Sequence, residues 1–274
     1  MPGPTFLTKQ DIEQVFDGAA SSYDRAGPAI FAEFSQRLLR EVPLDPGMRV
    51  LDIATGTGAV LLEAARRVGP EGHVVGIDLS EGILREAQQA VAAAGLTNVE
   101  LRKMDAEHLD FPDMSFDVVT CAFALFMLPD MEAALRETYR VGKPDGYIAI
   151  TYFNKTPPPF DPRWRVYAQE CTAYGIGMRM PQKLGLAPEE LEAVLTRSGF
   201  RIVKTHSEVY DIVYPTGEDW WGFMLTMGSR AAILNMDDDT RARFKADYLA
   251  ALRPALREDG YHMSTGVIYA VARR

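Results

Sequence analysis

The chain has 274 residues, 47% of them apolar and 24% charged, which is the composition of a globular protein long enough to bury one large core. Its net charge of −9 argues against a nucleic-acid partner, and no apolar run approaches the ~20 residues of a membrane-spanning helix. Its two cysteines, Cys121 and Cys171, are too few for a disulfide framework or a cysteine-based zinc site, so we expect a reducing, cytoplasmic setting.

The N-terminal segment predicts two helices joined by a loop. Thr8 is a suitable cap for the first helix. Phe31, Phe34, Leu38 and Leu39 give the second helix an apolar stripe. Residues 16–24 lie between them and are small and polar around two aromatic residues, which is typical of a loop.

Residues 48–153 alternate between short buried-type strands and helices. We expect strands at 48–53, 73–77, 99–104, 116–121 and 147–153, the last after a turn at 143–146, with helices starting at Gly58, Ser80 and Asp130. This alternation predicts a parallel sheet wrapped by helices. Ligands of such sheets bind beyond the carboxyl ends of the strands. Asp52, Asp78 and Asp105 lie at the ends of successive strands and therefore mark that edge as a site.

The pattern changes after Phe153. Prolines at 157–162 break the chain, and helices are expected up to about Tyr174 and from Pro188 to Gly199. Strands at 200–207 and 265–271 flank an aromatic segment at 220–227 and a helix that Pro254 should end. The acidic run 237–239 is interpreted as the start of that helix.

The turn after the first sheet strand carries Gly56 and Gly58, which allow a tight turn and open a helix whose free N–H groups face a ligand. A nicotinamide-binding turn would have a third glycine where Leu61 stands, and Asp52 would repel a pyrophosphate. A ligand with a cationic end and no phosphate, such as S-adenosylmethionine, fits better. The helix N-terminus suits its carboxylate, Asp52 its ammonium directly or through water, Asp78 both ribose hydroxyls and Asp105 the adenine amino group.

Together these motifs resemble the class I S-adenosylmethionine-dependent methyltransferases, in particular the small-molecule branch similar to the enzymes of ubiquinone and menaquinone biosynthesis. The matching segments are 50–58, 75–80, 105–107, 116–119 and 135–146, with Gly142 and Asp145 as departures in the last. The resemblance implies a Rossmann-like, doubly wound α/β fold with a mostly parallel seven-stranded sheet whose last strand is antiparallel. Residues 16–24 also look like the family's F-D-x-x-A-x-x-Y-D motif, which implies that Tyr23 closes over the cofactor, with packing within a loop as the alternative.

The resemblance further implies one domain over residues 1–274. Residues 45–153 would form the cofactor-binding core, and 1–44, 154–185 and 208–258 would be helical additions that form a lid. The residues expected to bind S-adenosylmethionine are Tyr23, Asp52, Ala54, Gly56, Thr57, Gly58, Asp78, Leu79, Asp105, Ala106, Glu107, Ala122 and Phe123.

The acceptor side departs from the family. Relatives often carry L-H-H-L-x-D after the fourth strand, whereas this chain has Phe126 and Met127 in place of both histidines. That change removes a general base and predicts an apolar pocket, for which Phe126, Met127, Phe153 and Trp164 are the candidate lining residues. His262 is the one candidate base among the four histidines, with a structural role as the alternative. No His/Cys/carboxylate set has metal-ligand spacing, so no metal is expected.

The sequence therefore predicts methyl transfer from S-adenosylmethionine to an oxygen or carbon of a small, hydrophobic acceptor, either quinone-like or a secondary metabolite. One alternative is a protein of this fold that binds the cofactor without methyl transfer, acting as a cyclase or a binding module. The lack of an identified base keeps that alternative open. The other is a nicotinamide oxidoreductase, which Leu61 and Asp52 disfavour.

Overall fold

The computed structural model describes residues 5–23, 30–157, 163–177, 179–181, 183–226 and 230–274. Its main sheet has the strand order β4-β3-β2-β5-β6-β10-β8, and the two-residue β9 pairs with β10. Neighbouring strands are parallel from β4 to β6, whereas β10 is antiparallel to both β6 and β8. The doubly wound, mostly parallel sheet with an antiparallel last strand is therefore confirmed.

The strands of the main sheet are β2 (Arg49–Ile53), β3 (His73–Asp78), β4 (Val99–Lys103), β5 (Phe116–Ala122), β6 (Gly142–Phe153), β8 (Arg201–Tyr214), β9 (Leu256–Arg257) and β10 (Gly260–Arg273). The described helices are α1 (Lys9–Ala19), α2 (Ile30–Glu41), α3 (Ala59–Val68), α4 (Glu81–Ala93), α5 (Met131–Val141), α6 (Arg163–Ala173), α7 (Pro188–Arg197), α8 (Gly217–Met224), α9 (Arg230–Leu234) and α10 (Asp238–Leu252). Short 3-10 turns lie at Leu125–Met127 and Arg253–Ala255. The strands β1 (Thr5–Phe6) and β7 (Arg179–Met180) pair with each other in parallel.

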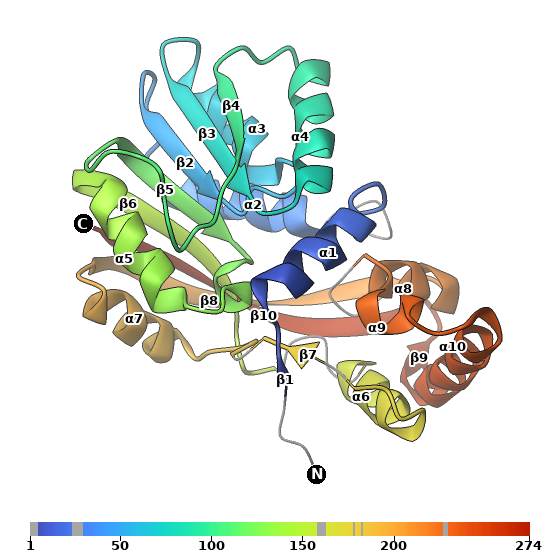
Figure 1. Cartoon of the computed structure of the whole chain (residues 1–274). Coiled ribbons are helices and arrows are strands. Elements are labelled where there is room, and N and C mark those ends of the chain that lie inside the picture. The colour runs from blue at the N-terminus through green and yellow to red at the C-terminus, as the bar shows by residue number, and fades with distance from the viewer. Residues whose placement is uncertain (1–4, 24–29, 158–162, 178, 182, 227–229) are drawn as a thin grey trace.

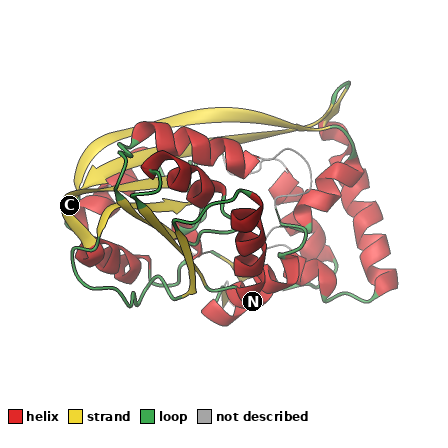
Figure 2. Cartoon of the chain, turned by 90° about the horizontal axis from the view of Figure 1, so that it is seen from above, coloured by secondary structure: helices red, strands yellow, loops and turns green. Residues whose placement is uncertain are grey.

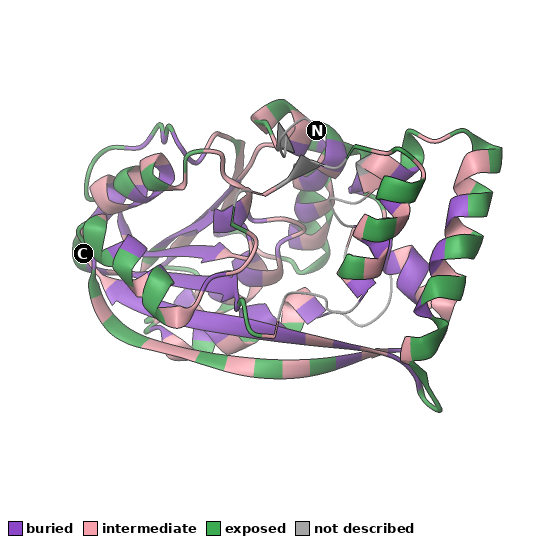
Figure 3. Cartoon of the chain, turned by 90° about the horizontal axis from the view of Figure 1, so that it is seen from below, coloured by how far each residue is buried: buried purple, intermediate pink, exposed green. Residues whose placement is uncertain are grey.

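Helices cover the sheet, and a second group of helices lies beyond its carboxyl edge (Figure 1). α2 packs against α3 and β6, α4 against β3 and β4, and α7 against β8 and β10. The buried apolar residues form one continuous cluster from Ile30 to Ala272, which appears as the purple interior in Figure 3. None of the described helices is long and apolar enough to cross a membrane.

The N-terminal helix is longer than predicted. The side chains of Thr8 and Asp11 cap it reciprocally, as the cap prediction required. α1 continues to Ala19, so the loop expected from residue 16 was wrong for 16–19. Val15 and Ala19 are buried on the same helical stripe, and their burial extends the helix into the small residues. Asp24 of the N-terminal motif lies outside the described residues.

Two features of the sheet differ from the prediction. The turn expected at 143–146 is part of β6, because a register shift between β5 and β6 absorbs the extra residues and Asp145 bends the chain at φ +60°. β8 and β10 are also longer than expected. β10 pairs with β6 from Val267 onward, so residues 261–266 run past β6 and pair with β8, and β9 pairs with Gly260 and Tyr261. Figure 2 shows this hairpin reaching the far group of helices.

Several helix boundaries are confirmed by their caps. Ser80, Asp130 and Asp237 each accept a hydrogen bond from a backbone N–H in the first turn of the following helix. α10 ends at Leu252, before Pro254, as proline chemistry predicts. The sequence therefore located the ends of these helices from cap chemistry alone.

Candidate cofactor and acceptor site

A cleft opens beyond the carboxyl ends of β2, β3 and β5, where the strand-end aspartates were expected to mark a site. It holds about 680 Å³ of space, its open mouth included. Of the predicted site residues, nine line it: Tyr23, Ala54, Gly56, Asp78, Leu79, Ala106, Ala122, Phe123 and Met127. The structure therefore brings together residues from five separate segments of the predicted core and the N-terminal addition.

Other predicted residues do not line this cleft. From the cofactor set these are Asp52, Thr57, Gly58, Asp105 and Glu107, and from the acceptor and catalytic sets Phe126, Phe153, Trp164 and His262. The cleft also has lining residues that the sequence did not single out, namely Ile12, Phe16, Ile77, Ile83, Met104, Ala124 and Leu128. The unpredicted members are all apolar, so they carry no chemical motif by which a single sequence could reveal them.

The glycine turn has the backbone shape that its two glycines allow. Gly56 has φ +58° and Gly58 has φ +97°, a region that favours glycine over other residues. Gly58 is also the N-cap of α3, so the first N–H groups of that helix face the turn. Tyr23 covers the turn, since a Cβ on Gly56 would lie 3.8 Å from its ring carbon Cε1. At its two glycines the turn therefore exposes backbone to a ligand, and the ring of Tyr23 lies over Gly56.

Asp78 lies at the end of β3 and is held by backbone donors. Its Oδ2 accepts from the N–H of Gly56 at 3.1 Å, and its Oδ1 from the N–H of Ser80 at 3.0 Å. Burial raises the pKa of Asp78 to about 6, and these backbone hydrogen bonds limit the rise. A carboxylate has about four acceptor positions, so Asp78 keeps capacity for further donors in the cleft.

Asp52 is placed beneath the turn rather than in the cleft. It is 1% exposed, and its two oxygens accept from the hydroxyls of Thr55 at 2.6 Å and Thr120 at 2.7 Å. Burial raises its pKa to about 6. Asp52 does not line the cleft, so of the two contacts with a ligand ammonium that the sequence allowed, its position favours the one through water. Asp52 also ties the turn to β5 through the hydroxyl of Thr120.

The carboxylates of Asp105 and Glu107 are occupied by a lysine from α1. Lys9 Nζ lies 2.6 Å from Asp105 and 2.5 Å from Glu107. Burial alone would raise the pKa of Asp105, but its hydrogen bonds, with that from Lys9 the strongest, hold the pKa below the usual value. Glu107 also accepts from the N–H of Asp130, the N-cap of α5, at 2.8 Å. Both acids therefore join elements around the cleft, and Ala106 between them supplies the lining.

α1 is also fixed to the start of α4, by an acid of its own. Asp17 accepts from the Ser80 hydroxyl at 2.6 Å and from the N–H of Gly82 at 2.8 Å, both at the start of α4. This arrangement sets Ile12 and Phe16, which are four residues apart, into the wall of the cleft. The i, i+4 spacing of the pair was visible in the sequence, but it does not distinguish a cleft wall from a core contact.

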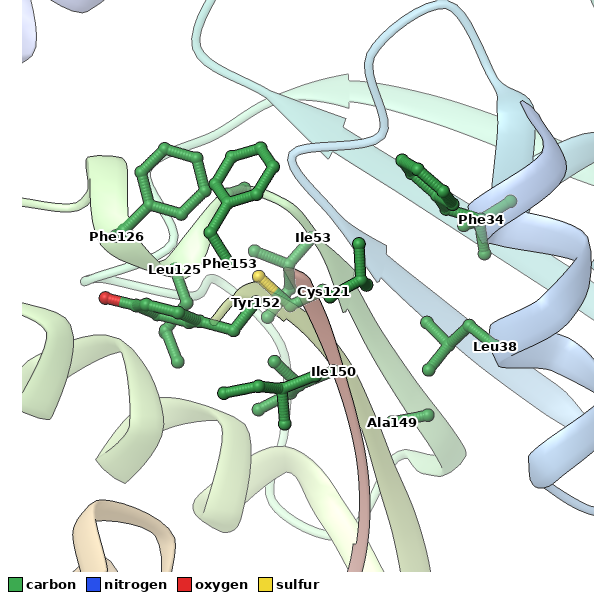
Figure 4. Close-up of a cluster of buried hydrophobic side chains, with 14 of the residues drawn as sticks. Phe34, Leu38, Ile53, Cys121, Leu125, Phe126, Ala149, Ile150, Tyr152 and Phe153 are labelled. Carbon is green, nitrogen blue, oxygen red and sulfur yellow. The ribbon is translucent and has the colours of Figure 1, made fainter. Parts of the chain in front are cut away.

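The predicted acceptor residues divide between cleft and core. Phe126 and Phe153 are 9% and 1% exposed, and their ring centroids are 5.3 Å apart. Figure 4 shows the two rings in the buried apolar cluster. Neither lines the described cleft, so their assignment to the pocket wall is not what this structure shows. Phe123 connects the two environments, because it lines the cleft and its ring lies 4.8 Å from that of Phe153.

His262 and Trp164 lie away from the cleft. The ring nitrogens of His262 lie 2.5 Å from Asp211 and 2.7 Å from Asp259, and these contacts raise its pKa. A histidine held between two carboxylates outside the cleft fits the structural alternative better than the catalytic one. Trp164 packs against Tyr167 on α6, with ring centroids 5.2 Å apart. The described residues contain no group of three or more potential metal ligands.

Comparisons with known proteins identify relatives over most of the chain. A family model described as a methyltransferase domain matches residues 44–212. Nocamycin O-methyltransferase of Saccharothrix syringae is 34% identical over 253 residues, which cover 87% of this chain and 89% of that protein. Demethylmenaquinone methyltransferase of Listeria monocytogenes is 38% identical over 165 residues, which cover 59% of this chain and 68% of that protein.

Solved structures share the fold. A Bacillus halodurans protein described as a methyltransferase has a TM-score of 0.62 and 24% identity, covering 88% of this chain and 98% of its own. The cyclase SpnF also has a TM-score of 0.62, with 22% identity and coverage of 100% and 99%. At these identities the structural likeness concerns the fold alone.

Proposed function

This chain belongs to the class I S-adenosylmethionine-dependent methyltransferases, and from that premise we propose that it methylates an oxygen or carbon of a small, hydrophobic organic acceptor. S-adenosylmethionine is the methyl donor. The observation that carries the proposal is the apolar lining of the cleft, in which Tyr23 and Asp78 are the described residues with side-chain oxygens. Such a lining favours an acceptor with little polar surface.

We infer the following roles for the cleft residues toward the donor. Asp78 accepts the ribose hydroxyls with the lone pairs that its two backbone donors leave free. Gly56 and Ala54 leave backbone room for the methionine part, whose carboxylate suits the α3 N-terminus at Thr57 and Gly58. The apolar residues Leu79, Ile83, Met104 and Ala106 suit the adenine ring.

When bound, S-adenosylmethionine supplies a methyl group on a sulfonium centre, which a nucleophile displaces in line. This displacement removes a positive charge, so a cleft that excludes water favours it. Phe123 and Met127 provide apolar surface in the cleft, and Tyr23 covers the glycine turn. Correct placement of nucleophile and methyl group is the main rate contribution that such a cleft offers.

The cleft lining also restricts which acceptor groups can react, because a group that is not acidic would need a general base. No histidine is among the described residues that line it, so a strong general base is not in place there. We propose that the acceptor group ionises readily, as a phenol or carboxylic acid does. The names of the relatives support a small organic acceptor, since one is an O-methyltransferase and the other is named for a demethylated quinone.

We further propose that residues 45–153 form the cofactor core of a single domain, with the segments 1–44, 154–185 and 208–258 shaping the acceptor side. α1 already supplies Ile12 and Phe16 to the cleft, which supports a role for the first of these additions. A cytoplasmic setting fits the two cysteines, which are free and buried.

The proposal is tested first by ligand-induced stabilisation. S-adenosylhomocysteine is expected to raise the melting temperature, whereas NAD is expected to leave it unchanged. The protein is then incubated with S-adenosylmethionine and a panel of hydroxynaphthalenes and arene carboxylic acids. Formation of S-adenosylhomocysteine with a product one CH₂ heavier than its acceptor would support the proposal. Stabilisation by NAD alone would contradict it, and cofactor binding with an acceptor converted but not methylated would favour a cyclase.

A further inference from the structure

Arg163, the first residue of α6, is a buried cation without an anionic partner in the described part of the chain. Its side chain is 0% exposed, and neither Nε nor Nη1 has a hydrogen-bond acceptor there. Native proteins seldom leave buried polar groups unpaired, because an uncompensated buried charge lowers the stability of the fold. Such a group is therefore better explained by a ligand that completes it than by packing alone.

The surroundings of Arg163 are aromatic rather than acidic. Its guanidinium carbon lies 5.7 Å from the centroid of Trp220. The Tyr248 hydroxyl accepts from Trp220 Nε1 at 2.7 Å and donates to the backbone carbonyl of Arg163 at 3.3 Å. The ring of Trp220 can stabilise a cation through its face, but it offers no acceptor to the in-plane N–H groups.

The carboxylate that acts on Arg163 electrostatically is already committed. Burial lowers the pKa of Arg163, and Tyr248 and Asp211 partly oppose that effect. Asp211, however, lies 2.5 Å from His262 and 3.8 Å from Arg257, and no ion pair joins it to Arg163 within the described ranges. Asp211 is therefore paired with His262 and Arg257 and makes no direct ion pair with Arg163 among the described residues.

Helix α8 connects this cation with the mouth of the cofactor cleft. Trp220 near the start of α8 packs over Arg163, and the carbonyl of Leu225 at its C-terminal end accepts from Arg230 Nη1 at 3.3 Å. The same Nη1 lies 3.4 Å from the hydroxyl of Ser22, the neighbour of Tyr23. Figure 1 shows α6, α8 and α9 grouped beyond the carboxyl edge of the sheet. Arg163 therefore belongs to the acceptor side of the molecule.

We propose that Arg163 binds a carboxylate of an aromatic acceptor, which accepts from its unpaired N–H groups beside the ring of Trp220. A guanidinium N–H donates a strong, charge-assisted hydrogen bond to a carboxylate oxygen, and neighbouring rings suit an arene. The bound carboxylate is an anchor and not the methylated group, since Arg163 does not line the cofactor cleft. This proposal rests on the proposed methyl transfer, because it defines the acceptor class for that reaction.

The test compares matched acids and amides on the protein saturated with S-adenosylhomocysteine. The probes are naphthoate and anthracenecarboxylate with their carboxamides, and binding is measured by calorimetry and thermal shift. Wild-type protein is expected to bind the acids more tightly than the amides. Arg163→Met should weaken acid binding by about tenfold to a hundredfold, the range for a hydrogen bond to a charged group, and leave the amides unchanged.

Two further variants separate recognition from folding. Arg163→Lys keeps the charge but not the planar guanidinium with its fixed N–H directions, so acid binding should be intermediate. Arg165→Met removes an exposed arginine on the same helix and should bind like wild type. Equal binding of acid and amide by wild type, binding of neither, or equal acid binding by Arg163→Met would each overturn the proposal. Binding of S-adenosylhomocysteine is measured separately, so a failure of the proposed function shows independently of Arg163.

Discussion

The cofactor core and the region beyond it differ in whether their buried charged side chains have hydrogen-bond partners within the protein. In the core, the protein satisfies its own buried acids: Asp52 by two threonine hydroxyls and Asp78 by two backbone N–H groups. Beyond the core, Arg163 is fully buried and two of its nitrogens lack an acceptor among the described residues. The core is thus a preformed site, whereas the outer region is built to be completed by a ligand.

This difference corresponds to what each region binds. A donor common to the family can be bound by backbone geometry, as at Gly56 and the end of β3 of this chain. An acceptor particular to one protein must be met by individual side chains. The comparison can be tested by removing groups from each side and measuring binding and stability separately.

The largest effect is expected for Asp78→Ala. Two hydrogen bonds to a charged acceptor are worth about 1.5–3 kcal/mol each, so the affinity for S-adenosylhomocysteine should fall roughly 10²–10⁴-fold. Isothermal calorimetry measures this loss directly. Asp110→Ala removes an exposed acid near the same edge and serves as the control. Unchanged affinity in Asp78→Ala would mean that the ribose is held elsewhere and that the core is not preformed at this residue.

Phe126→Ala and Met127→Ala test whether adjacent residues serve core and cleft separately. Phe126 is buried against Phe153 and Tyr152, so its truncation should lower the free energy of unfolding by about 3–5 kcal/mol. Met127 lines the cleft and is partly exposed, so its truncation should lower the free energy of unfolding by only about 1 kcal/mol. Urea denaturation measures both, and equal losses would show that Met127 is also a core residue.

The pair also shows where sequence reasoning succeeded and where it could not. Strand alternation placed Asp52, Asp78 and the segment 105–107 at one edge, because parallel strands end on the same side of a sheet. Phe126 and Met127 occupy one 3-10 turn and face different surroundings. Nothing in two consecutive apolar letters distinguishes core from cleft. The functional motif located the region, but burial decided the role of each side chain.

The outer region was predicted less well for physical reasons. The extension of β8 was signalled by Tyr210, Ile212 and Tyr214, which alternate with more exposed residues and were not included in the expected strand. Arg163 gave no such signal, because an arginine at a helix start is normally solvated. Its burial depends on Trp220, which lies 57 residues later in the chain. Contacts of that kind cannot be inferred from local periodicity.

A smaller, graded effect is expected from pH. The pKa of Asp78 is raised to about 6, and ribose binding needs the ionised carboxylate. Below pH 6 the affinity for S-adenosylhomocysteine should therefore fall about tenfold per pH unit, and it should level off above pH 7. The free protein responds with the opposite sign at this group, since protonation below pH 6 relieves the buried charge and adds stability. Calorimetry from pH 5 to pH 8 measures how the affinity for S-adenosylhomocysteine changes with pH. If Asp78→Asn keeps the same pH dependence, another group is responsible, and Asp52 is the first candidate.

The smallest effect is expected for Lys9→Met, and it tests what Asp105 and Glu107 do. Lys9 bridges both acids from α1, and its side chain is 35% exposed, so losing the ion pairs should weaken S-adenosylhomocysteine binding at most about fivefold. S-inosylhomocysteine lacks the adenine amino group. If these acids only anchor α1, its binding to Lys9→Met should weaken by the same factor as that of S-adenosylhomocysteine. If Asp105 instead accepts from the amino group, freeing it from Lys9 should increase the preference for S-adenosylhomocysteine over the inosine analogue. Lys155→Met, which breaks an exposed pair with Glu190, is the control. Because both carboxylates lie outside the cleft lining, we expect Lys9→Met to lose equal affinity for the two ligands. That result would mean that Asp105 and Glu107 hold α1 in place and do not recognise the adenine amino group.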